Sequence, residues 1–523
     1  MNARSIEKLA YAALCPMLIS TLGVRAEDWS EWRGPSRSGA LKECPALIDS
    51  IPEGGLKELW KVEVPGGGNG NWSSPVGANG KAYVHVSWAK KEPIEQRKID
   101  GGVLKRLGRF DKSAPQAIMD KIETARVSEE RKKQDGKAVK GWVKNWVETN
   151  LNEEERKKYG RMAEDRLNRG VKALSVETLK ELHGLGNKTF ANQAELDEWI
   201  AGAGLNDADK TELNKHVPKD RSYRDDVLVC VDAKTGKIAW QKEYSGGGGG
   251  RPASNTPCVD DGKVYFRGNS GVLYCLDAGS GDEVWKDEAA GKDAPNSSMT
   301  VVDGKLIVAG KGALVALDAK TGKEAWRCAD IKAQDNSPSV WVHGGKSYII
   351  AAGGKIGCVD AADGKVVWTV PGNKWTTPAV SGDFMAFTTS GKQMSVYKLS
   401  LEKAEEVATF TQSSRSCSPI MDGKFAYCMA RGDGVCIDAE TGKEVWKGKG
   451  NNDTYSSPLL ADGKILCNHR RGFILYDAAT GKELGQAPIG FGECMSLGIV
   501  DGKLLARSNS HLTCYDLRKA SGG

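Results

Sequence analysis

The chain has 523 residues, of which 40% are hydrophobic and 27% charged. Its 74 basic and 68 acidic residues nearly balance, and the formal net charge of +6 lacks the strong basic excess expected of a nucleic-acid-binding protein. Beyond the first 26 residues, no run reaches the roughly 18 uninterrupted apolar residues of a membrane-spanning helix. We therefore expect neither a nucleic-acid partner nor a transmembrane segment.

Residues 1–26 have the pattern of a secretory signal peptide. Arg4 and Lys8 supply a basic start, residues 9–23 are largely apolar, and Val24-Arg25-Ala26 loosely fits a cleavage motif. We expect cleavage near Ala26 and a mature protein that is periplasmic or secreted.

Residues 27–88 are predicted to contain two pieces of β structure. An isolated strand at 56–64 carries Trp60, and the polar pair of Ser73-Ser74-Pro75 opens a hairpin whose second strand ends at Trp88. The isolated strand has no partner beside it in the sequence, so it can complete a sheet elsewhere.

The pattern changes completely over residues 89–226. This stretch has 30 Lys or Arg and 26 Asp or Glu residues. Asn152 and Asn192 are each followed three residues later by Glu, as in the capping box of a helix start. We expect a charged helical insertion between the second and third strands of the first repeat.

One phrase, Asp-Ala-x-Thr-Gly-Lys-x-x-Trp, returns through residues 227–523. Copies begin at Asp232, Asp277, Asp318, Asp360 and Asp438, and a further copy at Asp477 lacks the tryptophan. The intervals are 45, 41, 42, 78 and 39 residues, so the longest spans two periods. Together with tight Asp-Gly-Lys hairpins, a period near 40 predicts four short antiparallel strands per repeat, as in a propeller blade.

We therefore predict an all-β fold, an eight-bladed β-propeller of four-stranded antiparallel blades. The blades begin near Ser73, Asn255, Ser297, Asn336, Thr376, Cys417, Ser456 and Met495. The last repeat ends near Leu517 without a fourth strand, so the strand at 56–64 is predicted to complete it and close the ring. The repeated tryptophans are predicted to dock one blade on the next.

Twelve cysteines follow the signal peptide. Five of them lie two residues before the repeated aspartate position: Cys230, Cys275, Cys358, Cys436 and Cys514. Equivalent sites in separate blades are too far apart for a disulfide, so we interpret them as buried thiols. Cys428 and Cys436 lie across one hairpin, where a disulfide is an alternative to two thiols.

The loops just before the first strands are predicted to line one mouth of the central channel. The candidate ligand- or partner-binding residues there are Trp72, Arg251, Asn296, Asp335, Trp375, Arg415 and Tyr455. Aromatic, cationic and acidic groups around one funnel suit a flat anionic ligand or a peptide, and a polar funnel without a dedicated ligand is the alternative. No catalytic residue or metal ligand is assigned.

The repeats resemble the quinoprotein-dehydrogenase-like, or PQQ-like repeat, propeller superfamily, which shares the Thr-Gly-Lys-x-x-Trp phrase. Trp29-Ser-Glu-Trp32-Arg33-Gly34-Pro35 resembles the opening of its exported bacterial members. The resemblance implies two branches. Dehydrogenases bind pyrroloquinoline quinone (PQQ) with calcium and oxidise alcohols or sugars, whereas a non-catalytic BamB-like branch docks proteins of outer-membrane assembly.

The sequence departs from the dehydrogenase branch, whose soluble alcohol-oxidising members commonly stack the quinone against a disulfide of adjacent cysteines. It has no Cys-Cys pair and no Cys-x-x-Cys-His haem motif. We favour an exported scaffold, without catalysis or cofactor of its own, that binds a protein or other macromolecule of the cell envelope. The alternatives are a PQQ- and calcium-dependent alcohol or sugar dehydrogenase with a divergent site, and a polysaccharide-binding module.

Overall fold

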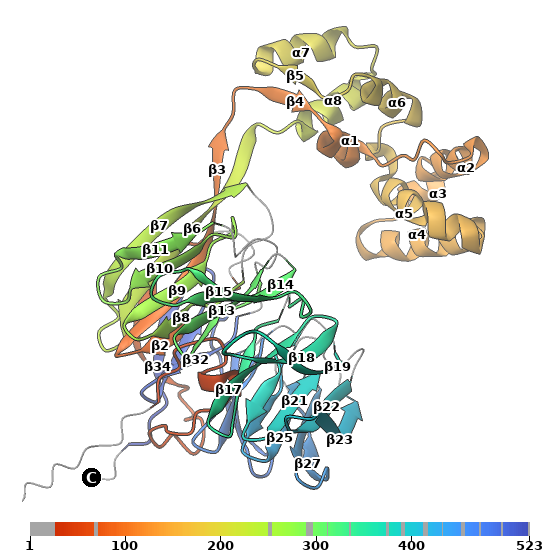
Figure 1. The fold of residues 1–523 in the computed structure, drawn as a ribbon. Coiled ribbons are helices and arrows are strands. Elements are labelled where there is room, and N and C mark those ends of the chain that lie inside the picture. Colours follow the sequence, from red (N-terminus) through yellow and green to blue (C-terminus); the bar gives the residue numbers. More distant parts are fainter. Residues whose placement is uncertain are drawn as a thin grey trace, which may run out of the picture. The chain divides into compact units, whose positions relative to one another are not determined.

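The computed structural model describes most of the chain in two compact units. The residues described are 27–66, 72–248, 254–288, 296–310, 312–333, 336–372, 376–388, 393–411, 417–430, 432–450, 456–469, 472–492 and 495–520. One unit combines the chain up to Lys90 with the chain from Tyr223 onward, and the other is 91–222. Figure 1 shows strands in the first unit and mainly helices in the second.

Within these residues, the first unit contains eight four-stranded antiparallel sheets, an all-β architecture consistent with a propeller (Figure 1). In pairing order, the sheets of the N-terminal half are β2 (Val76–Ala78), β3 (Lys81–Pro93), β6 (Asp220–Asp232) and β7 (Ile238–Gly248); β8 (Cys258–Asp260), β9 (Lys263–Arg267), β10 (Leu273–Asp277) and β11 (Glu283–Asp287); β12 (Thr300–Val302), β13 (Lys305–Gly310), β14 (Ala313–Asp318) and β15 (Glu324–Cys328); and β16 (Ser339–His343), β17 (Lys346–Ala352), β18 (Lys355–Asp360) and β19 (Val366–Pro371).

The remaining sheets follow the same order, and the last takes its outer strand from the start of the chain. They are β20 (Ala379–Ser381), β21 (Phe384–Thr388), β22 (Gln393–Leu399) and β23 (Ala404–Thr411); β24 (Ile420–Asp422), β25 (Phe425–Ala430), β26 (Asp433–Asp438) and β27 (Glu444–Gly448); β28 (Leu459–Ala461), β29 (Lys464–His469), β30 (Gly472–Asp477) and β31 (Glu483–Ala487); and β32 (Gly498–Val500), β33 (Lys503–Arg507), β34 (His511–Asp516) and β1 (Lys57–Glu63).

The pairing of β1 with β34 joins the two ends of the described chain. Trp60 lies opposite Cys514, the same register in which Trp285 lies opposite Cys275. The strand expected at 56–64 therefore occupies the outer position of the last sheet. This arrangement removes an open sheet edge, which would otherwise expose unpaired backbone groups.

The repeated phrase forms a tight turn around its aspartate. Asp232 Oδ1 accepts hydrogen bonds from the Thr235 amide and hydroxyl, both at 2.8 Å. The Gly236 amide donates to the Asp232 carbonyl at 2.8 Å, with Gly236 at a φ of 73°. Glycine suits this position because a side chain rarely adopts a positive φ.

The tryptophan of one sheet packs on the turn of the next. Each of six indole N–H groups donates to a backbone carbonyl of the following sheet at 2.8–3.2 Å: Trp60 to Ala233, Trp240 to Ala278, Trp285 to Ala319, Trp326 to Ala361, Trp368 to Ser400 and Trp446 to Ala478. A Cβ added at Gly236 would lie 2.7 Å from Trp60, so the turn glycine also makes room for the ring. The predicted docking role of the tryptophans is confirmed.

The copy without a tryptophan uses a different side chain at this place. Gly485 pairs with Leu475 in the register that Trp285 has with Cys275. A Cβ at Gly485 would lie 2.8 Å from Cβ of Ile51, which comes from the N-terminal part of the chain. Ile51 therefore packs where a tryptophan stands in the other copies.

The cysteines at the repeated position are buried and free, as predicted. Cys428 and Cys436 are also free, because Cys428 pairs with Val435 and Cys436 with Tyr427. Their side chains consequently occupy successive register positions and do not form the alternative disulfide.

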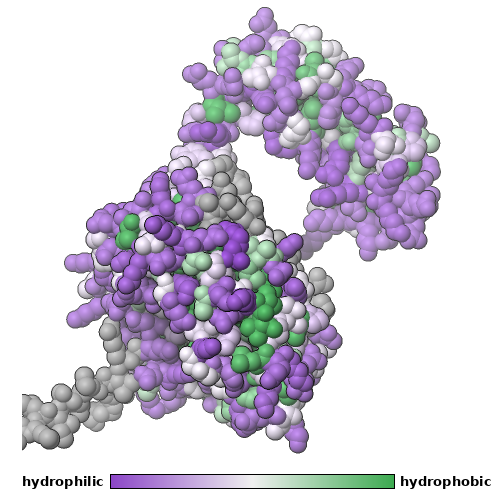
Figure 2. Space-filling model, in the orientation of Figure 1, coloured by the Kyte–Doolittle hydropathy of each residue, from purple (hydrophilic) through white to green (hydrophobic). Residues whose placement is uncertain are grey.

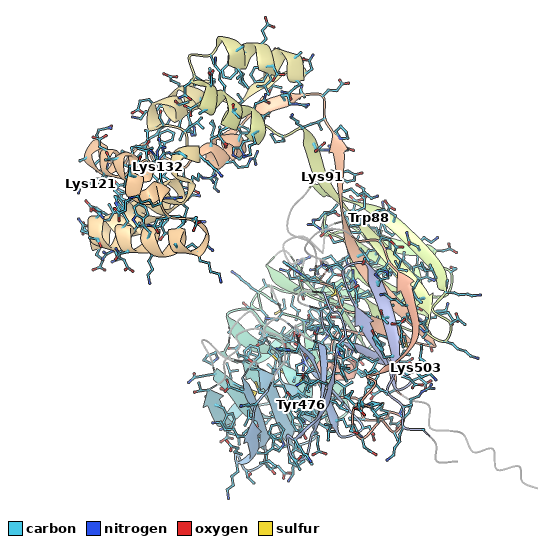
Figure 3. The ribbon with its side chains drawn as sticks, turned by 180° about the vertical axis from the view of Figure 1, so that it is seen from behind. Trp88, Lys91, Lys121, Lys132, Tyr476 and Lys503 are labelled. Carbon is cyan, nitrogen blue, oxygen red and sulfur yellow. The ribbon has the colours of Figure 1, made fainter. Side chains whose placement is uncertain are left out.

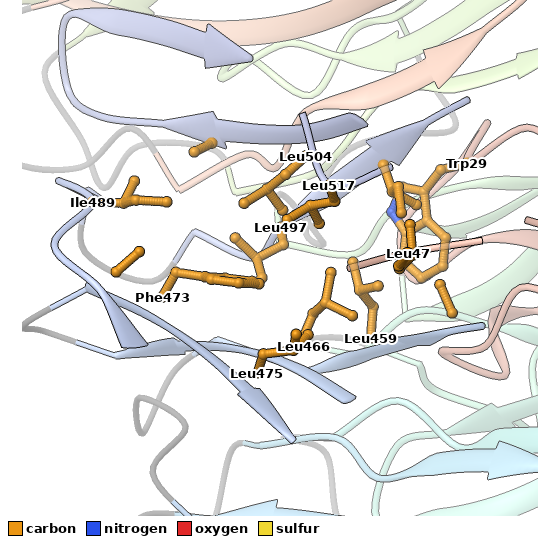
Figure 4. Close-up of a cluster of buried hydrophobic side chains, with 14 of the residues drawn as sticks. Trp29, Leu47, Leu459, Leu466, Phe473, Leu475, Ile489, Leu497, Leu504 and Leu517 are labelled. Atoms are coloured by element: carbon orange, nitrogen blue, oxygen red, sulfur yellow. The ribbon is translucent and has the colours of Figure 1, made fainter. Parts of the chain in front are cut away.

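A further cluster of apolar side chains lies between the last two sheets (Figure 4). Trp29 and Leu47, from the N-terminal segment, pack there with residues such as Phe473 and Leu504. The N-terminal segment is therefore part of the core of the β unit.

The second unit contains, within the described residues, eight α-helices and one two-stranded sheet. They are β4 (Arg97–Ile99), α1 (Gly101–Leu107), α2 (Gln116–Arg126), α3 (Glu129–Lys132), α4 (Gly136–Asn150), α5 (Glu153–Arg169), α6 (Val176–Gly184), β5 (Lys188–Phe190), α7 (Gln193–Gly202) and α8 (Asp207–His216), with a 3-10 turn η2 (Gly170–Lys172) after α5. The face of this unit in Figure 2 is mainly hydrophilic.

The helix starts follow the sequence signals in part. Asn152 and Glu155 form a complete capping box at the start of α5. At α7, Asn192 caps the Glu195 amide, but the Glu195 carboxylate accepts from Ala191 instead of Asn192. None of the helices in the described ranges is long and apolar enough to cross a membrane.

Candidate functional site

Eight hydrogen bonds form a closed ring through the β unit. In each, a residue just before the first strand of one sheet donates its backbone amide to the side-chain hydroxyl of the equivalent residue in the next sheet. The donor–acceptor pairs, at 2.9–3.2 Å, are Ser74–Thr256, Thr256–Ser298, Ser298–Ser337, Ser337–Thr377, Thr377–Ser418, Ser418–Ser457, Ser457–Ser496 and Ser496–Ser74. The polar pairs seen in the sequence thus position the candidate site by joining neighbouring sheets.

Residues 29–41, which we call the plug segment, cross the first strands on one side of this ring. Four first-strand amides, each three residues beyond the ring, donate to plug carbonyls at 2.8–3.0 Å: Gly77 to Trp29, Val259 to Ser30, Met421 to Ser38 and Leu460 to Gly39. The 3-10 helix η1 (Pro35–Arg37) of this segment contacts β16 and β20. The plug segment therefore spans sheets from the whole length of the β unit.

Three charged side chains of the plug segment are buried. The Arg33 guanidinium donates to the carbonyls of Ser418 and Pro419, and burial lowers the pKa of Arg33 to about 10. Arg37 lies 3.3 Å from Glu31 and also donates to the Met299 carbonyl. Burial raises the pKa of Glu31, and Arg37 opposes that rise. These groups fix the plug against the sheets and do not face solvent.

The predicted binding residues precede the ring residues in the sequence, by two positions for Trp72, Asn296, Asp335, Trp375 and Tyr455 and by three to five for Arg415 and Arg251. Trp72 and Asn296 lie in the described part of the chain, and Asn296 accepts a 2.9 Å hydrogen bond from Ser254 of the neighbouring sheet. The other five, Arg251, Asp335, Trp375, Arg415 and Tyr455, lie outside the described residues. The funnel therefore stays a prediction, with Ser254 and Asn296 as its described contact between sheets.

A buried polar network between β3, β6 and the turn after β9 was not predicted. His85 of β3 lies 3.0 Å from Asp226 of β6, and both side chains are almost fully buried. Asp226 also accepts from the backbone amide and side-chain amide of Asn269, at 2.7 and 3.0 Å. Because Asp226 accepts these bonds, the network fastens β3, β6 and the turn after β9 together.

The described residues do not group as a metal centre. Among them, no three His, Cys, Asp or Glu side chains are placed to share an ion.

The β unit corresponds to a known repeat family. The family model described as outer membrane protein assembly factor BamB matches residues 221–409 and 311–521, which together cover more than half of the chain. The chain belongs to this family. It is thus a BamB-like protein with PQQ-like propeller repeats, as the repeated phrase predicted. No curated protein matches the chain.

Several solved structures are similar to part of the chain. BamB from Moraxella catarrhalis is 19% identical, with 57% of this chain and 90% of that chain covered and a TM-score of 0.45. Quinohemoprotein alcohol dehydrogenase from Comamonas testosteroni is 14% identical, with 58% and 74% covered and a TM-score of 0.43. The computationally designed Ika8 protein is 13% identical, with 56% and 93% covered and a TM-score of 0.43.

The plug segment is the feature that sequence reasoning missed in this family member. The motif from Trp29 to Pro35 was noted in the sequence, but only for its resemblance to a family. The signal that points to a buried role is the pairing of Glu31 with two arginines in a segment flanked by Trp29 and Trp32, since buried charges require partners.

Proposed function

We propose that the protein is a non-catalytic scaffold of the cell envelope. Its eight blades, closed by β1, would present the funnel opposite the plug segment to a protein partner. The observation that carries this proposal is membership of the BamB family over residues 221–521. By that relationship, the partner is a protein of outer-membrane assembly, met in the periplasm after signal-peptide cleavage near Ala26, and no cofactor is required.

The position of the plug segment supports a partner-binding site on only one side of the propeller. Its main chain is hydrogen-bonded to first strands on one side of the Ser/Thr ring, whereas the loops with the predicted binding residues precede the ring. Loops on a rigid scaffold are common sites of binding. A partner would therefore dock on the loop side.

Capture of envelope proteins by the purified full chain tests this proposal. The double variant Trp375→Ala/Arg415→Ala should lose the captured partner while its melting temperature stays unchanged, because funnel side chains contribute binding and not blade packing. The control Val342→Ala/Arg327→Ala removes an apolar side chain that is 60% exposed and a surface arginine paired with Glu324, and it should keep the partner.

Three outcomes contradict the proposal in different ways. Undiminished capture by the funnel variant places the partner elsewhere on the chain. Tight binding of added PQQ and Ca²⁺, with dye-linked oxidation of an alcohol or sugar, shows a dehydrogenase. Retention on an immobilised envelope polysaccharide, lost with the same two substitutions, supports the carbohydrate-binding alternative.

A further inference from the structure

The helical unit contains a pocket of about 450 Å³ whose lining is strongly basic. It lies where the ends of α2, α5 and α8 meet α3 and η2. Six lining side chains are cationic: Arg126, Arg131, Lys132, Arg169, Lys172 and Lys215. Glu212 is the single acidic residue of the lining, and His216 completes the charged set.

The arginines build the pocket and hold their positions by hydrogen bonds. Arg131 is buried and donates to the carbonyls of Leu167 and Asn168, at 2.6 and 2.7 Å, at the end of α5. Arg126 and Arg169 have carboxylate partners, Glu123 at 2.8 Å and Asp165 at 3.0 Å. Arg131 has no carboxylate partner among the described residues, so its charge is offset only by carbonyl dipoles.

The lysines extend from the rim with amines that can turn toward a ligand. Lys132, labelled on the helical unit in Figure 3, pairs with Glu129 at 2.7 Å, and Lys215 lies 3.6 Å from Glu212. The lysine side chains of both pairs are exposed, so the pairs hold them only weakly. Lys172 is exposed and has no ion pair with any residue that the structure describes.

His216 responds to the charge of this pocket. Its Nε2 lies 3.3 Å from Glu212, which favours the imidazolium. The pKa of His216 is nevertheless lowered, chiefly by burial; Glu212 opposes this, and Lys215, Arg169 and Arg106 add to the lowering. The excess of six cationic side chains over one carboxylate in the lining gives the pocket its positive charge.

We propose that this pocket binds a compact, multivalent anion of the phosphate class. Guanidinium and ammonium groups converging from several elements suit several anionic oxygens at once. The pocket volume is that of a small ligand and not of a folded partner. This site is separate from the propeller funnel and does not depend on the function proposed for it.

Pyrophosphate binding to the full chain, followed by calorimetry, is the direct test. Replacing Lys132, Lys172 and Lys215 together by alanine should raise the Kd by about tenfold or more, because each lost charge-assisted contact contributes more than an ordinary hydrogen bond. The matched control replaces Lys137, Lys140 and Lys144, three exposed lysines of α4, and should leave the Kd unchanged.

The titration of His216 gives a local readout that does not depend on folding effects of the lysine variant. The chain has six histidines, and the His216→Gln variant identifies the His216 imidazole signal by its loss. Pyrophosphate should raise the pKa of His216 by about one unit, because an anion a few ångströms away stabilises the imidazolium. The other five signals should not move.

A second binding experiment, with lipid vesicles, distinguishes a soluble phosphate ligand from a lipid headgroup. Lysine-dependent binding of pyrophosphate indicates a free phosphorylated ligand, and lysine-dependent binding of phosphatidylglycerol vesicles without pyrophosphate binding indicates a headgroup. Either result supports the anion site. Failure of both probes, or equal losses in the pocket and control variants, would overturn it.

Discussion

At the scale of single residues, the nine positions of the repeated phrase have two structural roles, one in the turn and one in the contact between sheets. Its aspartate folds its own turn, and its glycine leaves space for the tryptophan of the preceding sheet. Local turn chemistry and contact between sheets are therefore encoded together. Repeat proteins are stabilised by such contacts between neighbours, so each copy contributes at two places.

Gly322 and Trp285 should be energetically coupled. Gly322 has a φ of 71°, and a Cβ there would lie 2.8 Å from the Trp285 ring. Gly322→Ala should cost about 1–2 kcal/mol for its backbone and more for the clash. Gly304→Ala, at a φ of 70° with open space around it, should show only the backbone cost.

The coupling itself is measured by a double-mutant cycle in urea. Because Trp285→Ala removes the clashing ring, the double variant Gly322→Ala/Trp285→Ala should lose less stability than the sum of the two single changes. Additive losses would show that the ring and the turn do not press on each other.

The turn aspartates should make stability fall in acid. Hydrogen bonds from Thr235 lower the pKa of Asp232, and those from Thr321 lower the pKa of Asp318. A folded-state pKa below the unfolded value of 3.8 gives stability that is present above pH 3.8 and lost as the pH falls through the folded value. Between pH 7 and pH 3, urea midpoints should therefore fall more for the native protein than for Asp232→Asn/Asp318→Asn.

The exposed residue Asp330 supplies the control for this acid effect. Asp330→Asn should change the urea midpoint little at both pH values, because this exposed side chain makes no hydrogen bond to any residue that the structure describes. An acid loss that is the same in the native protein and in the double variant would refute the role of the turn aspartates.

At the scale of elements, the strands were more predictable than the segments that join sheets from different parts of the chain. Each repeat encodes its own hairpins, so periodicity and Asp-Gly turns locate the strands. The predicted strands, however, stopped at Trp88 and resumed at Val227. In the structure, β3 continues to Pro93 and β6 begins at Asp220. Those ends pair with each other and leave no turn signal in the sequence.

The plug segment and the funnel show where sequence reasoning ends. The plug is held by backbone hydrogen bonds to first strands far away in the chain, and such contacts have no periodicity to detect. The funnel prediction included Asn296, which accepts a hydrogen bond from Ser254 of the neighbouring sheet. Trp375 lies outside the described residues, and its place in the funnel stays a prediction.

The buried ion pair of the plug should be costly to break. Arg37→Ala leaves Glu31, which is 7% exposed, without its cation, and we expect a loss of about 3–5 kcal/mol in the free energy of unfolding. Glu31→Gln/Arg37→Met should recover much of that loss because no charge stays buried. If the single variant unfolds like the native protein, the plug does not depend on this pair.

At the scale of the whole molecule, the two units should fold independently. Each has its own apolar clusters, and the boundaries at Lys90 and Tyr223 keep the ion pair of Lys90 with Asp225, at 2.7 Å, inside the β unit. A Gly/Ser linker in place of residues 91–222 should leave one cooperative thermal transition, since a longer or shorter loop changes closure entropy only slowly.

Production of the helical unit by itself is a second test of independent folding. Residues 91–222 produced alone should give a cooperative helical melt by circular dichroism. A broad, uncooperative transition in the linker variant would mean that the helices contribute to the core of the β unit.

The closed ring also determines when the protein can finish folding. Trp60 lies opposite Cys514, and Ser496 donates to Ser74, so the earliest part of the described chain pairs with nearly the last. Contacts this distant in sequence form slowly. A chain that emerges N-terminus first must therefore leave β1 without its sheet partner until β34 has been made, whereas the plug segment can already bind early first strands such as β2 and β8. The last sheet, and with it the closed ring, is the final part of the β unit to form.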